Sequence, residues 1–251
     1  MTPTPRSGTK AAPKHPAKFS NGIVEIAADW IRKHDPYGHH GDGRVHVLDP
    51  FAGVGGVHRL RAMVDVVTTG IEIEEVWASA HPDTIVGDAL DLPYPFSDGF
   101  FDVIFTSPTY ANRLADKHKV GGGKGEAKPW VRRSYTHDLR EATGDPEATL
   151  HPNNSGTMQW GDHYKRFHTR FIVGANRALC DRGLFMLNVS NHVRNGRVVD
   201  VCEWWEHLMV DNGYKCIERE EVPTPRLRYG KNHEARVSHE MIYCWKRGTR
   251  P

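Results

Sequence analysis

The chain has 251 residues, of which 38% are hydrophobic and 25% are charged, and its formal net charge is +2. This composition is typical of one globular domain with a substantial core, so it excludes wholesale disorder. No run of about 18 apolar residues occurs, and the polar N-terminal stretch does not resemble a secretory signal. We therefore expect a cytoplasmic protein that does not contact membranes.

The chain divides into a short arm and one long domain. Residues 1–17 are rich in proline, basic and free of acidic residues, so we expect a flexible basic arm. Over residues 18–251, apolar periodicity predicts helices alternating with strands. The predicted helices are 22–34, a short one ending near 63, 74–80, one from about 162 to just before Gly183, and 198–210. The predicted strands are 45–48, 66–73, 84–86, 101–105, 184–189, 215–222 and about 237–245.

This alternation predicts the fold class. Strands separated by helices imply a parallel sheet covered on both faces, and the last two strands are expected to be antiparallel at one edge. We therefore expect a single-domain α/β fold with a Rossmann-like, doubly wound, mostly parallel sheet of about seven strands and an antiparallel edge hairpin. Residues 111–161 show little apolar periodicity, and we expect an irregular insertion that acts as a lid or in target recognition.

The cysteines and histidines do not predict a metal site or disulfides. Cys180, Cys202, Cys216 and Cys244 form no CxxC pair and lie in apolar segments, which favours buried free thiols. The sixteen histidines show no ligand spacing on a predicted helix, so no metal is expected.

Candidate functional residues follow four successive predicted strands. The first strand runs into the glycine-rich stretch Asp49–Gly55, and the second carries Glu72 within Gly-Ile-Glu-Ile near its end. The third is followed by Asp88, and the fourth by Ser107–Tyr110. A glycine-rich turn of this kind also binds NAD or serves only as a tight turn, and a lone acid at a strand end is often an exposed cap. The set of four is more specific, because ligands of such sheets bind at the carboxyl ends of the strands. The 23-residue spacing from Asp49 to Glu72 is typical of ribose recognition.

These motifs resemble those of the S-adenosylmethionine-dependent DNA amino-methyltransferases. Asp-Pro-Phe-Ala-Gly-Val-Gly from Asp49 resembles the first motif of that family, and Thr-Ser-Pro-Thr-Tyr ending at Tyr110 resembles its catalytic (D/N/S)-P-P-Y tetrad. Lys18-Phe19-Ser20 resembles the tenth motif, so the order is tenth, first, then catalytic. The resemblance covers roughly residues 18–194. Thr109 stands where the family usually has a second proline, so we expect a less rigid loop.

The resemblance implies a role for each matching residue. Glu72 would accept the ribose hydroxyls and Asp88 the adenine amine, while Ser107 and the Pro108 carbonyl would accept from the target amine. Tyr110 would stack on the flipped base. The implied catalytic residues are Ser107, Pro108 and Tyr110. The implied S-adenosylmethionine contacts are Lys18, Phe19, Ser20, Asp49, Phe51, Ala52, Gly53, Gly55, Glu72, Ile73, Asp88, Ala89 and Ser107.

Charge is distributed unevenly along the chain. Residues 62–105 contain nine acids and no lysine or arginine, whereas 111–140 contain eight basic residues and three acids. A second basic loop is expected at 223–236. Both segments are expected near the catalytic end, where cations contact DNA phosphates, although a solvated loop is an alternative. The expected nucleic-acid contacts are Asn112, Arg113, Lys119, Lys124, Arg132, Arg133, Arg226, Arg228 and Lys231.

The resulting interpretation is a DNA methyltransferase that modifies cytosine N4 or adenine N6. Cytosine C5 chemistry requires a thiolate, usually in a Pro-Cys pair, and none of the four cysteines follows a proline. Two alternatives stay open: an RNA base or guanine-N2 methyltransferase on the same fold, and an inactive protein that binds cofactor and DNA. A compact methylase without a separate recognition domain would suit a bacteriophage or prophage.

Overall fold

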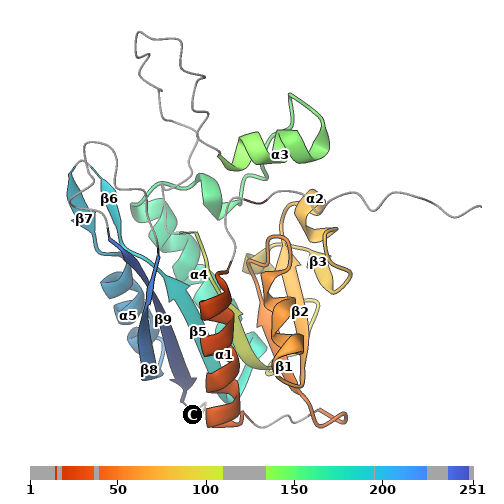
Figure 1. Ribbon diagram of the computed structural model, residues 1–251, viewed down its shortest axis with the longest axis vertical. Helices are drawn as coiled ribbons and strands as arrows, with labels where there is room; N and C mark the ends of the chain where they lie inside the picture. The colour runs from red at the N-terminus through yellow and green to blue at the C-terminus, as the bar shows by residue number, and fades with distance from the viewer. Residues whose placement is uncertain are drawn as a thin grey trace, which may run out of the picture.

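The computed structural model describes residues 15, 19–36, 40–109, 134–194, 196–224 and 237–248. Seven strands form one sheet in the order β3-β2-β1-β4-β5-β9-β8 (Figure 1). β1 to β5 pair in parallel, and β9 is antiparallel to both β5 and β8. The expected fold class is therefore confirmed. The strands are β1 (Val45–Asp49), β2 (Val66–Glu72), β3 (Thr84–Val86), β4 (Phe101–Thr106), β5 (Leu179–Val189), β8 (Tyr214–Pro223) and β9 (His239–Arg247).

Helices bury both faces of the sheet. Helix α1 (Asn21–His34) and the 3₁₀-helix η1 (Gly56–Ala62) pack on one face, and α4 (Asp162–Ala178) and α5 (Val201–Asp211) pack on the other (Figure 1). Successive strand residues point to opposite faces, so Val47 lies in the α1 cluster and Leu48 in the α4–α5 cluster. This two-sided burial explains why the central strands are continuous apolar runs.

The region expected to be irregular contains a helix. Helix α3 (Tyr135–Thr143) lies within residues 111–161, and the short 3₁₀-helix η3 (Ser155–Thr157) follows it. The Ser134 hydroxyl accepts the N–H of His137 at 3.2 Å and caps α3, and Gly144, with φ of 73°, ends it. The helix is only nine residues long, which is too short for its apolar face to form a clear periodic pattern.

Two element boundaries also differ from the prediction. Helix α4 ends at Ala178, and Leu179, expected inside the helix, is extended and pairs with Phe101 in the sheet. The expected helix start at 198 is wrong, because Val198 lies in a small antiparallel hairpin of β6 (His192–Arg194) and β7 (Arg197–Val199). Tertiary pairing overrides local propensity at both places.

Short elements connect the first strands. Helix α2 (Glu75–Ala78) follows β2, and the 3₁₀-helix η2 (Ala89–Asp91) follows β3. All four cysteines are free thiols; Cys202 and Cys244 are buried as expected, whereas Cys180 and Cys216 are half-buried. Among the described residues, none of the helices combines the length and apolarity that crossing a membrane would require.

Candidate active site

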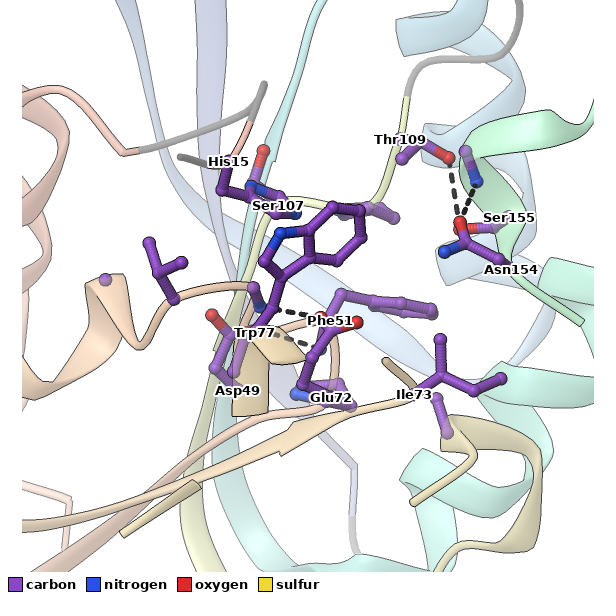
Figure 2. Close-up of a pocket in the computed structure, with 18 of the residues that line it drawn as sticks. His15, Asp49, Phe51, Glu72, Ile73, Trp77, Ser107, Thr109, Asn154 and Ser155 are labelled. Carbon is purple, nitrogen blue, oxygen red and sulfur yellow. Dashed lines mark hydrogen bonds between the residues drawn. The ribbon is translucent and has the colours of Figure 1, made fainter. Parts of the chain in front are cut away.

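A cavity of about 640 Å³ opens at the carboxyl ends of β1, β2, β3 and β4 (Figure 2). Of the expected cofactor contacts, Ser20 is described but does not line the cavity. Its hydroxyl instead accepts the N–H of Ile23 at 3.3 Å and caps α1. Lys18 lies outside the described residues. The other expected cofactor contacts line the cavity, together with Pro108: Phe19, Asp49, Phe51, Ala52, Gly53, Gly55, Glu72, Ile73, Asp88, Ala89 and Ser107.

The loop after β1 is held by a buried carboxylate. Asp49 Oδ1 accepts the N–H of Phe51 at 3.0 Å and the hydroxyl of Thr106 at 2.7 Å, which ties this loop to the end of β4. Gly53 and Gly55 have φ of 53° and 81°, in the left-handed region that favours glycine. A Cβ on Gly53 would lie 2.9 Å from the His15 ring, so this loop needs glycine for its conformation and for close approach.

Glu72 links the glycine loop to the end of β2. One carboxylate oxygen accepts the N–H of Gly53 at 2.8 Å, and the other accepts the N–H of Glu74 at 3.0 Å. Each oxygen keeps a second lone pair, so the group can still accept hydrogen bonds from a ligand. Burial raises the pKa of Glu72 to about 7 and that of Asp49 to about 7, and in both cases the hydrogen bonds counteract this rise.

Residues 151–157, which we call the bridging segment, form a wall of the cavity that the sequence did not indicate. Glu74 is buried and accepts the N–H of His151 at 2.8 Å and the side-chain amide of Asn154 at 2.7 Å. The Asn153 amide donates to Asp88 Oδ2 at 2.7 Å, and Asp88 Oδ1 accepts the N–H of Leu90 at 2.9 Å. The run Asn-Asn-Ser-Gly signals a turn, but nothing in it indicates these partners.

The segment after β4, Ser107–Thr109, completes the cavity at the fourth strand end. The Thr109 hydroxyl donates to Ser155 Oγ at 3.1 Å, and the Thr109 carbonyl accepts the hydroxyl of Tyr164 at 2.8 Å. Figure 2 shows Thr109 and Ser155 next to each other, joined by this hydrogen bond. The expectation of a looser loop did not anticipate these two contacts. Tyr110 lies outside the described residues.

Three aromatic side chains form a further part of the lining. The His15 ring lies 4.6 Å from Trp77 and 5.6 Å from Tyr135, edge-on to both (Figure 2 shows His15 beside Trp77). His15 belongs to the segment expected as a flexible arm, and the rest of residues 1–17 lies outside the described residues. The buried Trp77 Nε1 has no hydrogen-bond acceptor among the described residues.

All the expected nucleic-acid contacts lie outside the described residues: Asn112, Arg113, Lys119, Lys124, Arg132, Arg133, Arg226, Arg228 and Lys231. The structure shows other cations around Trp160, whose ring packs on Tyr164. Lys165 Nζ lies 5.2 Å from the centre of the Trp160 ring, and Arg194 donates to the Trp160 carbonyl at 3.2 Å. Arg166 follows Lys165 on α4, Arg197 on β7 pairs with Arg194 on β6, and both Arg166 and Arg197 are exposed. Within the described parts of the chain, these four cations form no ion pair.

Comparison with known proteins establishes the fold. No family model and no curated protein matches the chain. Three solved structures share its fold at a TM-score of 0.50. MccD protein is 13% identical, and the match covers 90% of this chain and 96% of that one. The [4+2]-cyclase SpnF is 14% identical with coverages of 94% and 85%, and a putative sarcosine dimethylglycine methyltransferase from Galdieria sulphuraria is 11% identical with coverages of 90% and 86%. The chain therefore has a Rossmann-like fold of the methyltransferase type. Because one of these proteins is named a cyclase, the fold alone does not decide the reaction.

Proposed function

We propose that this chain is an S-adenosylmethionine-dependent methyltransferase that methylates an exocyclic amine of a DNA base, cytosine N4 or adenine N6. One observation carries the proposal: Ser107 and Pro108 of the tetrad-like motif line the same cavity as Gly53, Glu72 and Asp88. These residues come from four strand ends, and their types match what cofactor binding and amine methylation each require.

The cavity suits S-adenosylmethionine. Its volume of about 640 Å³ lies within the roughly 300–1,000 Å³ range of small-molecule sites. Glu72 and Asp88 retain acceptor positions for ribose hydroxyls and the adenine amine, and Gly53 leaves room beside the loop backbone. Ile73 offers an apolar surface for the adenine ring, and Phe19 lines the cavity while stacking on Phe105 at 4.4 Å. When bound, the cofactor supplies a methyl group on a positively charged sulfur.

The residues after β4 address the weak nucleophilicity of an aromatic amine. The lone pair of such an amine is delocalised into the ring, and acceptors on its hydrogens favour the tetrahedral, reactive form. Ser107 Oγ and the Pro108 carbonyl would accept these hydrogens and stabilise the positive charge that develops on nitrogen. No protein nucleophile is required, and the four cysteines lie outside the cavity lining.

The described cations support a polyanionic substrate. The Tyr164 hydroxyl holds the Thr109 carbonyl, the Tyr164 ring packs on Trp160, and both Lys165 and Arg194 contact Trp160. Lys165, Arg166, Arg194 and Arg197 are not neutralised by ion pairs within the described residues, although the exposed Asp162 is close in sequence. Phosphates are the natural partners of such a group. The basic segments at 111–140 and 223–236 would extend this surface.

A methyl-transfer assay with labelled cofactor tests the proposal on duplex DNA, single-stranded DNA and RNA. Ser107→Ala is expected to lower the transfer rate about 100-fold. Ser79→Ala is the matched control, because it removes an exposed hydroxyl outside the cavity. Transfer to RNA instead of DNA would indicate an RNA methyltransferase, and cofactor binding without transfer would indicate an inactive binding protein. Either result contradicts the proposal.

A further inference from the structure

Thr109 is held from two sides, although it occupies the tetrad position where the resemblance leads one to expect a rigid proline. Its hydroxyl donates to Ser155 Oγ at 3.1 Å, and its carbonyl accepts the Tyr164 hydroxyl at 2.8 Å. Tyr164 is fully buried on α4, and Ser155 is 6% exposed on the bridging segment. Two elements outside the β4 loop therefore fix both the side chain and the backbone of Thr109.

Ser155 is a firm anchor because the bridging segment is itself attached to two other strand ends. The Asn154 side-chain amide donates to the buried Glu74 just beyond β2, and that of Asn153 donates to Asp88 beyond β3. Gly156 packs so closely on Tyr135 that an added Cβ would lie 2.7 Å from its ring. Ser155 therefore cannot shift easily without breaking contacts at the cofactor end of the cavity.

Tyr164 on α4 provides a second anchor. Its hydroxyl also accepts the indole N–H of Trp205 at 3.4 Å, so the contact connects α5, α4 and the β4 loop. The Tyr164 ring packs on His168 and Trp160, which fixes its direction. Both anchors act on Thr109, whose backbone nitrogen belongs to the same peptide group as the Pro108 carbonyl.

We propose that Ser155 and Tyr164 are positioning residues that aim the Pro108 carbonyl at the target amine by holding Thr109. Holding the side chain and the carbonyl of Thr109 places its Cα and its backbone nitrogen. This restricts the orientation of the Pro108–Thr109 peptide, and so the direction of the Pro108 carbonyl. Hydrogen bonds thus take over the stiffening that a second proline would supply. This inference rests on the proposed function.

A double-mutant cycle tests the contact between Thr109 and Ser155. Ser155→Ala and Thr109→Val each remove the same hydrogen bond, so each is expected to lower kcat about 10- to 100-fold. The kcat of the double variant is expected to be no lower than that of the less active single variant. The affinity for cofactor should stay within about twofold, because neither hydroxyl is assigned to it. Ser79→Ala, which removes an exposed hydroxyl bonded to the Val76 carbonyl, is the control.

Amide hydrogen exchange separates positioning from catalysis. In Ser155→Ala and in Tyr164→Phe, the peptide covering residues 101–109 should exchange faster, while peptides from α1 stay unchanged. Normal kcat and unchanged exchange in a folded Ser155→Ala variant would overturn the proposal. A loss of activity that only follows a lower melting temperature would overturn it as well, because that outcome indicates a purely structural role. If the wild-type protein transfers no methyl group, the proposed function fails, and the exchange data still decide whether Ser155 holds the loop.

Discussion

We expect the two buried carboxylates to make the affinity for S-adenosylmethionine dependent on pH. Glu72 and Asp49 have a pKa of about 7 in the ligand-free protein because burial penalises their charged forms. A sulfonium cation and donating ribose hydroxyls both favour the ionised carboxylate. Binding should therefore strengthen as the pH rises from 6 to 8.

The size of the effect follows from the pKa. A group with a pKa of about 7 is about 90% protonated at pH 6 and about 90% ionised at pH 8. If only the ionised form of Glu72 binds well, the Kd for S-adenosylmethionine falls about tenfold over this range. Titration calorimetry at several pH values measures this change.

Glu72→Gln shows which group is responsible. The amide does not titrate, so this variant should bind S-adenosylmethionine more weakly at pH 8. It should also lose the part of the pH dependence that the Glu72 carboxylate causes. Any titration of the ligand itself is common to both proteins and cancels in the comparison. Glu75→Gln, which changes an exposed carboxylate nearby, should behave like the wild type. The reasoning is refuted if wild type and Glu72→Gln show the same dependence on pH.

Three further predictions follow from the site. Asp49 binds its proton more tightly in the folded protein than in the unfolded chain. The free energy of unfolding without ligand should therefore fall as the pH rises from about 4 to about 7. Chemical denaturation of Asp49→Asn should show a smaller fall over the same pH range. Gly53→Ala should cost about 1–2 kcal/mol of stability and most of the cofactor affinity, whereas Gly144→Ala, equally left-handed but open to solvent, should lose only stability. In filter-binding assays, Arg194→Gln should weaken DNA binding and reduce the salt slope by about one, while Lys215→Gln at the far end of the sheet should change neither.

The parts of the site that follow strands directly could be predicted from the sequence. Asp49, Glu72 and Ser107 each stand at or just after a run of apolar residues, and parallel strands bring such ends to one edge. Tyr164 could not be predicted in the same way. Its position in the apolar stripe of α4 indicates a core residue, and only the packed structure shows that its hydroxyl reaches the Thr109 carbonyl.

By itself, the sequence indicated how strands and helices alternate along the chain and which strand ends carry the candidate site residues, because burial on both faces and glycine-rich turns are local patterns. Only the tertiary structure decided where the bridging segment lies. Its contacts to Glu74, Asp88 and Thr109 join residues 80, 65 and 46 positions apart. The raised pKa values have the same origin, since desolvation depends on what surrounds a carboxylate in the folded chain rather than on its neighbours in sequence.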